Sequence, residues 1–438
     1  MQLKKHLKNN IRIYRHAILA VIIILAGFSA FLQFYPDNKL NLNGPVSGID
    51  KRRAFNNEIF DKVKENYWEK IEDKDLANLY ELAVEKVTEK DQSLSNQDKE
   101  GVLGLMDQVT SEQDTEENKN ALTAQVTDIV LANLKPFGRS RLYTTKQKQD
   151  LQNTVTNSDP NINLYSELGV NKDTSQEKVE EAYQKKIEEI SQKEDSPEKK
   201  EQLASIGRAF EALSTKERRE RYDTIGAEPT VLGKYLDPKT FYIPIKKYSP
   251  TTFNEFIEVA NSVDEKSQAD SLILDLRGNI GGAIDILPYF LGPFIGQNQY
   301  AYEFFHQGEY KPYKTQTGWL ESLLRYKKVV VLIDGETQSS GEVMASVLKK
   351  YNVGILVGTK TKGWGTVEQA FPIEHQLSEN ETYSAFMVHS ITLRDDNQPV
   401  EGRGIDPTIS IEDPDWAKQL MSYFNEQRLV DAVRKLTK

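Results

Sequence analysis

Residues 271–282 read SLILDLRGNIGG, and residues 333–342 read IDGETQSSGE. The first stretch is an apolar run that passes directly into a pair of glycines, Gly281 and Gly282, which is typical of a buried strand followed by a loop. The second stretch predicts a strand, a tight turn and then a helix that begins near Glu342. Chemistry is therefore expected where these two strands end.

Each of the two turns offers a group that acyl-transfer chemistry needs. A serine between a strand and a helix exposes its hydroxyl near the helix N-terminus, where the partial positive charge favours a developing oxyanion. Ser339 and Ser340 are both candidates for such a nucleophile. The glycines let backbone N–H groups approach an oxyanion closely. A Ser-Ser pair before a helix is also a common N-cap, and this structural alternative stays open.

The surrounding pattern predicts an α/β fold. Short apolar runs alternate with segments of helix length, which is typical of a sheet with helices on its faces. The runs are residues 241–245, 271–276, 329–333 and 354–358. A closing helix is expected from Trp416 onwards.

The two deciding stretches, in this order, resemble the S41 family of serine peptidases, the carboxyl-terminal processing or tail-specific peptidases. LILDLRGNIGG resembles the family's LILDLRGNPGG, residues 337–342 its SASASE, and residues 358–368 its GTKTFGKGSVQ. Residues 63–68 also look like the family's opening helix. The resemblance implies a ClpP/crotonase-like catalytic sheet and a serine endopeptidase that acts on protein tails or unfolded segments. Most relatives carry a PDZ domain before this sheet.

The resemblance assigns roles to four residues of the turns. It places the nucleophile on Ser339. The oxyanion donors that it implies are the backbone N–H groups of Ser340 and of Gly281 or Gly282. These parts of the family's machinery are present in the sequence.

The general base of the family is missing from its position. Trp364 stands where the family has this lysine, and Glu368 replaces the glutamine that orients it. A serine hydroxyl is a poor nucleophile until a neighbour removes its proton, which an indole cannot do. Lys362 is the candidate substitute base. If residues 362–366 are extended, its side chain points to the same face as the side chain of residue 364, about 7 Å from that position. The amine of Lys362 would have to be neutral to act as a base, whereas a nearby Glu368 favours its charged form. Lys360 lies farther away.

Two function classes therefore stay open, and the family resemblance favours the first. One is a serine endopeptidase in which Ser339 attacks and Lys362 replaces the family base. The other is a pseudoprotease, a membrane scaffold that binds peptides or partners without cleaving them. Lys360 and Lys362 also fit solvated lysines at a strand end, and the scattered histidines are expected to be surface or packing residues; these are His306, His375 and His389.

An uncharged stretch near the N-terminus predicts a membrane anchor. Residues 17–34 read AILAVIIILAGFSAFLQF, and as a helix they span about 27 Å, close to the hydrocarbon thickness of a bilayer. Basic residues without acidic ones precede it, which predicts a cytoplasmic segment 1–16 and an extracytoplasmic remainder; they are Lys4, Lys5, Lys8, Arg12 and Arg15. A cleaved signal peptide is the alternative. We favour an uncleaved single-pass signal anchor in the cell membrane.

The amino-acid composition restricts the classes of binding partner that are expected. The chain of 438 residues has 56 basic and 66 acidic residues, a net charge of −10, and lacks the basic surplus that drives nucleic-acid binding. It has no cysteine, which excludes disulfides and a cysteine nucleophile. No cofactor and no metal are predicted. The expected partners are protein or peptide substrates and the lipid bilayer, and a homo-oligomer is left open.

Helical periodicity organises the chain between the anchor and the sheet. Residues 50–150 predict a helical N-terminal subdomain, and residues 153–163 read as a linker. Two amphipathic stripes follow at residues 179–190 and 203–213. Residues 163–170 and 206–226 resemble the opening and the end of a J-domain. We therefore assign residues 160–226 to a J-domain-like hairpin, 235–412 to the S41-like domain and 413–438 to C-terminal helices.

The J-like segment departs from its family at one decisive place. Ser191-Gln192-Lys193 stands where that family has the His-Pro-Asp signature that stimulates an Hsp70 ATPase. The resemblance thus implies the fold, while the lost signature and the predicted extracytoplasmic location argue against Hsp70 as a partner. A structural or binding hairpin is expected.

Overall fold

The structure is a computed structural model that describes residues 48–158, 161–194, 196–264, 266–394 and 396–437. The anchor predicted at residues 17–34 and the segment 1–16 lie outside these residues. Within the described ranges, no helix combines the length and the apolar character that a membrane crossing needs.

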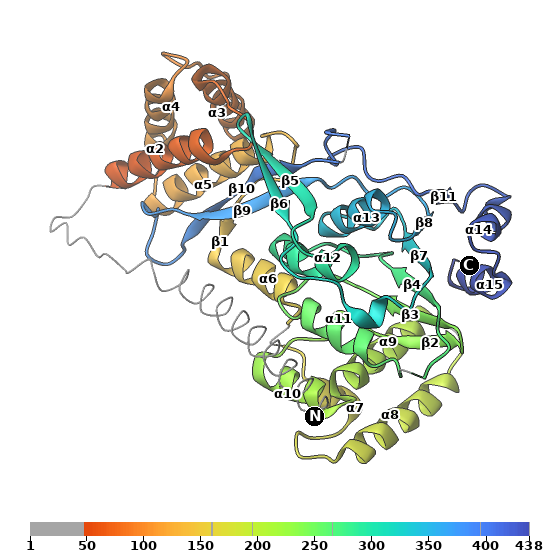
Figure 1. The fold of residues 1–438 in the computed structure, drawn as a ribbon. Helices are drawn as coiled ribbons and strands as arrows, with labels where there is room; N and C mark the ends of the chain where they lie inside the picture. Colours follow the sequence, from red (N-terminus) through yellow and green to blue (C-terminus); the bar gives the residue numbers. More distant parts are fainter. Residues whose placement is uncertain (1–47, 159–160, 195, 265, 395, 438) are drawn as a thin grey trace, which may run out of the picture. The chain divides into compact units, whose positions relative to one another are not determined.

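A six-stranded sheet in the order β11-β8-β7-β4-β3-β2 carries both deciding stretches (Figure 1). Its strands are β2 (Lys234–Asp237), β3 (Thr240–Pro244), β4 (Ser271–Asp275), β7 (Lys328–Ile333), β8 (Ile355–Gly358) and β11 (Ile409–Ser410). Neighbouring strands are parallel except for β2, which is antiparallel to β3. The four strands expected from the sequence are confirmed, and two short strands extend the sheet at its edges.

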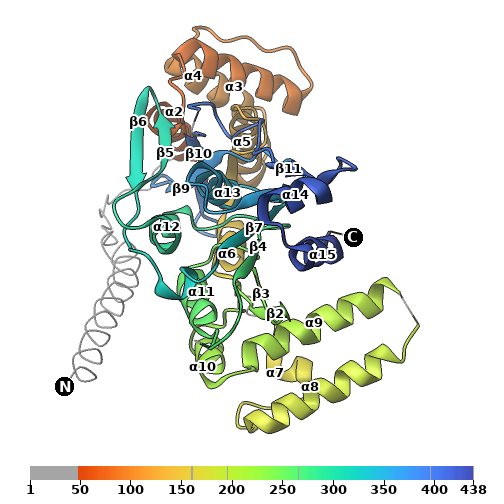
Figure 2. The same cartoon turned by 45° about the vertical axis from the view of Figure 1, so that its right-hand side comes forward.

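Helices cover both faces of this sheet, because successive side chains of a strand point to opposite sides. Leu272, Leu274 and Val331 share a core with residues of α11 (Thr252–Asn261), α12 (Leu287–Ile295) and α13 (Ser340–Lys350). Ile273 and Val330 point the other way and pack with residues of α14 (Trp416–Phe424) and α15 (Gln427–Leu436). Figure 2 shows these two helices beside the sheet. The C-terminal helices expected in residues 413–438, the first from Trp416, are thus α14 and α15. Two short 3₁₀ helices, η1 (Ile284–Ile286) and η2 (Glu321–Leu323), lie in the connections.

The N-terminal helices share their core with a second, antiparallel sheet. The helices are α2 (Gly48–Asn66), α3 (Asp73–Thr88), α4 (Lys99–Ser111) and α5 (Glu116–Ala132). The next helix, α6 (Thr145–Thr156), contributes none of its residues to this core. The sheet contains β1 (Arg141–Thr144), β5 (Tyr300–His306), β6 (Glu309–Lys314), β9 (Thr366–Pro372) and β10 (Tyr383–Thr392). β1 pairs with β10, with Leu142 opposite Ala385, and Ala385 belongs to the helical core. Helical periodicity at residues 50–150 missed β1, which is too short to carry a pattern of its own.

The J-like segment folds as the sequence predicts. It forms α7 (Leu164–Leu168), α8 (Gln176–Ser191), α9 (Pro197–Leu213) and α10 (Lys216–Ile225). α8 and α9 lie side by side as a hairpin in Figures 1 and 2, and the rings of Tyr183 and Phe210 stack between them at 4.1 Å. A bridge between Ser158 and Ala227 joins the two ends of the segment.

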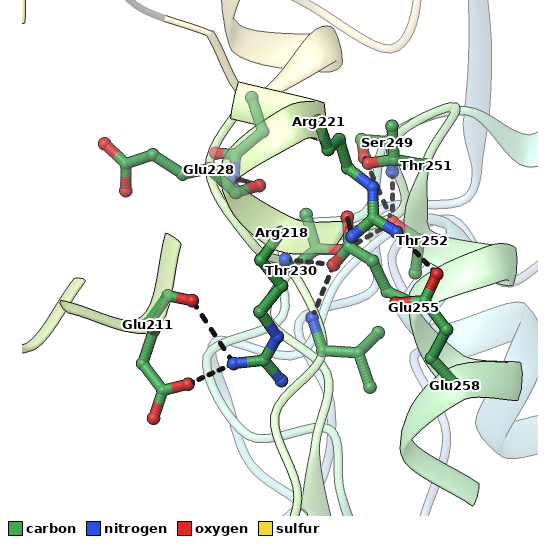
Figure 3. A network of polar contacts seen from close by, with 12 residues as sticks. Glu211, Arg218, Arg221, Glu228, Thr230, Ser249, Thr251, Thr252, Glu255 and Glu258 are labelled. Atoms are coloured by element: carbon green, nitrogen blue, oxygen red, sulfur yellow. Dashed lines mark hydrogen bonds and ion pairs between the residues drawn. The ribbon is translucent and has the colours of Figure 1, made fainter. Parts of the chain in front are cut away.

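An arginine connects the J-like segment to the sheet region (Figure 3). Arg221 of α10 donates from Nη2 to Glu258 Oε1 at 2.7 Å, and its Nη1 lies 3.9 Å from Oε1 of Glu255. Glu255 is 2% exposed, and its other oxygen accepts the backbone N–H groups of Thr230 (2.6 Å) and Val231 (3.1 Å). Because a buried carboxylate is costly without partners, this contact helps to hold α10 against α11.

Candidate active site

Ser339 lies in the turn between β7 and α13, where the sequence places the nucleophile. Its backbone adopts φ 54° and ψ −124°, a sparsely populated conformation for a residue with a side chain. The Thr337 hydroxyl donates to the carbonyl of Leu276 (2.8 Å), and the Gln338 N–H donates to the carbonyl of Asn279 (2.9 Å). The turn is thus fastened to the loop after β4. α13 begins at Ser340, so Ser339 also holds the N-cap position, in line with the structural alternative.

The two glycines of the loop after β4 pack directly against the turn. Gly281 has φ +83°, and a Cβ there would lie 2.6 Å from Cβ of Ser339. Gly282 has φ +128°, and a Cβ there would lie 2.2 Å from the carbonyl oxygen of Tyr248. Both the conformation and the close approach therefore require glycine. The structure brings Ser339 and the glycine pair together, as the sequence predicts.

Hydrogen bonding distinguishes the two glycine N–H groups as oxyanion donors. The Gly281 N–H donates to Oδ1 of Asn279 at 2.8 Å, so it is already engaged. Among the hydrogen bonds of the described residues, none uses the N–H of Gly282 or of Ser340. The Ser340 hydroxyl donates to the carbonyl of Gly282 at 3.0 Å, which holds the two residues together. Gly282 and Ser340 are thus the pair that can serve an oxyanion.

Neither candidate for the base contacts the Ser339 hydroxyl in the described hydrogen bonds. Lys362 extends to the surface, where its Nζ lies 3.2 Å from Oε2 of Glu336, and 38% of its side chain is exposed. The extended backbone considered for residues 362–366 is not formed, because Gly363 has φ +82° and β9 begins only at Thr366. Lys360 pairs with Asp406 at 3.6 Å.

Two carboxylates hold Trp364, the residue that the resemblance aligns with the family's lysine. Its backbone N–H donates to Oε2 of Glu342 at 2.7 Å, and its indole N–H donates to Oε1 of Glu368 at 3.1 Å. The Thr366 hydroxyl donates to the same oxygen of Glu368. Burial raises the pKa of Glu368, although these donors and the charge of Arg139 act in the opposite direction. An indole N–H is a donor only, so this position cannot accept a proton.

Glu342 is a residue of the site that the sequence analysis did not single out. Its carboxylate is fully buried, and Oε2 accepts the N–H of Ser339 (2.9 Å) as well as that of Trp364. Oε1 accepts the N–H of Gly363 (2.7 Å) and the hydroxyl of Thr361 (2.6 Å). One carboxylate therefore joins the turn that carries Ser339 to the loop of residues 361–364. Burial raises its pKa, and the four donors counteract that shift.

The histidines lie elsewhere. The rings of His306 and His389 stack at 4.3 Å on neighbouring strands β5 and β10, and Nδ1 of His306 lies 2.6 Å from the carbonyl of His389. His375 pairs with Glu58 at 2.9 Å. In the part of the chain that the structure describes, no group of three His, Asp or Glu residues is arranged to hold a metal ion.

Two regions of the chain match models of protein families. Residues 239–411 match the model of Peptidase family S41. They form an S41 peptidase domain. Residues 163–223 match the DnaJ domain. The J-like segment is thus a DnaJ domain that precedes the S41 domain in the chain.

The chain is similar to curated proteases of Bacillus subtilis (strain 168). It is 31% identical to the carboxy-terminal processing protease CtpA over 197 residues, which cover 45% of this chain and 40% of CtpA. It is 29% identical to CtpB over 237 residues, which cover 53% of this chain and 44% of CtpB. The chain thus spans less than half the length of these relatives.

Solved structures show a weaker likeness. A lipoprotein from Streptococcus agalactiae aligns with a TM-score of 0.47 and 14% identity over 88% of this chain and 99% of that protein. The photosystem II D1 C-terminal processing protease aligns with a TM-score of 0.46 and 13% identity over 84% and 94%.

Proposed function

We propose that the S41 domain binds extended protein segments at the Ser339 turn and does not cleave them in the arrangement described above. One observation carries this proposal: the family's base position holds Trp364, whose indole N–H is already donated to Glu368. General-base catalysis needs a basic group within about 2.6–3.2 Å of the hydroxyl, or one water away. Lys362, the substitute base considered from the sequence, pairs instead with Glu336 at the surface.

The binding part of the proposal rests on the groups that the site retains. The N–H groups of Gly282 and Ser340 donate to no acceptor among the described residues, so they can donate to the carbonyl oxygen of a bound segment. Ile280 beside them is 45% exposed. A protein segment supplies both a carbonyl oxygen and apolar side chains. The S41 family and its carboxy-terminal processing proteases support a protein as the ligand.

A second candidate function is hydrolysis with Lys362 as the base. It is supported by the short link between its backbone and the nucleophile turn, since the Lys362 N–H donates to the carbonyl of Thr337 at 3.0 Å. The ion pair with Glu336 is exposed, and such pairs contribute about 0–1 kcal/mol, so its loss costs little. A swing of the side chain towards Ser339 would also have to bury the amine enough to keep it neutral.

The test uses the full chain purified in detergent, with fluorescein-labelled casein as the probe for both binding and cleavage. We expect binding by fluorescence anisotropy, no cleavage, and cleavage by the double variant Trp364→Lys with Glu368→Gln, which rebuilds the family's lysine and its orienting amide. Ser339→Ala in that background is the control. Wild-type cleavage that disappears in both Ser339→Ala and Lys362→Ala but persists in Lys360→Ala would establish hydrolysis instead.

Membrane attachment and the role of the DnaJ domain belong to the same proposal. The uncharged stretch 17–34 and the basic residues before it support a single-pass anchor with the folded part outside the cell. Protease added to intact cells should then digest the S41 domain and spare residues 1–16; a soluble chain without an N-terminal anchor would indicate a cleaved signal peptide.

Since Ser191-Gln192-Lys193 replaces the J-domain family's His-Pro-Asp signature, the DnaJ domain should not stimulate an Hsp70 ATPase. A variant with His-Pro-Asp restored at these three positions is the positive control.

A further inference from the structure

An arginine from outside the S41 match covers the tryptophan at the family's base position. Cζ of Arg139 lies 3.3 Å from the centroid of the Trp364 ring, so the guanidinium rests on the face of the indole. Such a stack combines a cation–π interaction with planar contact, which lysine cannot reproduce. Arg139 belongs to the segment between α5 and β1, and the S41 match begins only at residue 239.

An ion pair with Glu401 holds the side chain of Arg139 in place. Its Nη2 donates to Oε1 of Glu401 at 3.1 Å, and the other oxygen of Glu401 accepts the N–H of Gly365, the residue after Trp364, at 2.8 Å. The side chains of Arg139 and Glu401 are 18% and 17% exposed, so this pair is shielded from water more than a surface pair.

The residue after Arg139 is hydrogen-bonded to β10, the strand that pairs with β9. The hydroxyl of Ser140, which is fully buried, accepts the N–H of Val388 on β10 at 3.1 Å. Val388 lies opposite Glu368 in the pairing of β10 with β9. The segment that carries Arg139 is therefore fixed next to the carboxylate that accepts the indole N–H.

The charge of Arg139 also fits the neutral indole. A lysine in place of the indole would lie beside the permanent positive charge of Arg139, which disfavours its protonated form. The neutral indole instead offers its π face to the guanidinium and its N–H to Glu368. Arg139 and Trp364 thus form a matched pair.

We propose that Arg139 is a positioning residue that locks the indole of Trp364 at the family's base position. Three contacts restrain the tryptophan: Arg139 on the ring face, Glu368 on the indole N–H and Glu342 on the backbone N–H. A residue outside the S41 match therefore decides how this part of the site is filled. The inference rests on the proposed function, because it names what keeps the base position closed.

The test follows the emission of Trp364 in the full chain. The chain has four tryptophans, so the signal of Trp364 is taken as the difference between each protein and the same protein with Trp364→Phe. In Arg139→Ala we expect the acrylamide quenching constant of Trp364 to rise about two-fold or more, because one ring face becomes accessible. Arg139→Lys should rescue this only in part, since an ammonium lacks the planar face.

Arg141→Ala is the matched control. Arg141 lies two residues away and pairs with Asp128 at 2.7 Å, so its loss removes an ion pair without uncovering Trp364. Its quenching constant should equal that of the wild type. Unchanged Trp364 quenching in an Arg139→Ala variant with native circular dichroism would overturn the inference.

If Arg139→Ala does not fold, Glu401→Gln decides the question, because it keeps the guanidinium and weakens its anchor. We expect an intermediate rise in quenching, and a value equal to the wild type would count against the inference. Casein cleavage by the wild type would refute the proposed function and leave the fluorescence result unaffected, so the two failures are distinguishable.

Discussion

Replacing the buried carboxylate of Glu342 with an amide should loosen the turn that carries Ser339. The carboxylate accepts four hydrogen bonds, two on each oxygen, from the turn that carries Ser339 and from residues 361–364. Glutamine has nearly the same size but offers one acceptor oxygen and one NH₂ donor. In either orientation of the amide, two of the four donors lose their acceptor. The Thr361 hydroxyl can turn to accept from the NH₂ group, whereas a backbone N–H then faces another donor.

The size of the effect follows from this count. A buried donor without an acceptor costs about 1–3 kcal/mol, so two such donors cost about 2–6 kcal/mol. A local destabilisation of about 3 kcal/mol makes local opening about a hundred-fold more frequent, since 1.4 kcal/mol corresponds to a factor of ten. The unfavourable backbone conformation of Ser339 adds to the effect, because its N–H bond to Glu342 helps to maintain it.

Hydrogen exchange measured by mass spectrometry is the appropriate assay. In Glu342→Gln, peptides that contain Ser339, Gly363 and Trp364 should exchange about a hundred-fold faster than in the wild type, because exchange reports local opening. Glu336→Gln is the control, since this glutamate is in the same turn, is 73% exposed and pairs with Lys362 at the surface. Unchanged protection of these peptides in folded Glu342→Gln would refute the reasoning.

Three further predictions concern stability. Burial raises the pKa of Glu368 above its ordinary 4.5, so the stability that its protonated form contributes is fully present below pH 4.5 and is lost as the pH rises through the folded-state pKa. Glu368→Gln should therefore flatten the decline of the urea midpoint with rising pH. Parallel plots of midpoint against pH for the wild type and the variant would contradict this. Burial, with the neighbouring His306, lowers the pKa of His389 from 6.5 to about 4, so stability should fall as the pH drops through this interval. His389→Asn should remove that fall, and an unaltered acid limb would disprove the assignment. Arg221→Met leaves the buried carboxylate of Glu255 without a cation and should cost about 3 kcal/mol or more in urea unfolding; an unchanged midpoint would show that the 3.9 Å contact contributes nothing.

Local sequence patterns suffice for much of the fold. β4 and β7 are buried on both faces, so they appear in the sequence as continuous apolar runs. α8 and α9 are amphipathic helices that pack against each other, and their stripes recur every three to four residues. β1 escaped detection because four residues between two helices contain no period, and its place is set by pairing with β10, more than two hundred residues away in the chain.

The sequence by itself determined the α/β fold, the DnaJ hairpin, Ser339 at the start of a helix and the glycine pair beside it, because each follows from neighbouring residues. Tertiary structure alone decided how these parts are used. The side chain of Asn279 engages Gly281 and leaves Gly282 as the free donor, and the φ of Gly363 interrupts the extended backbone that Lys362 would need. The environment of Trp364 depends on Arg139 and Glu401, which approach from distant segments. Such contacts depend on packing between elements far apart in the chain, and local periodicity carries no information about them.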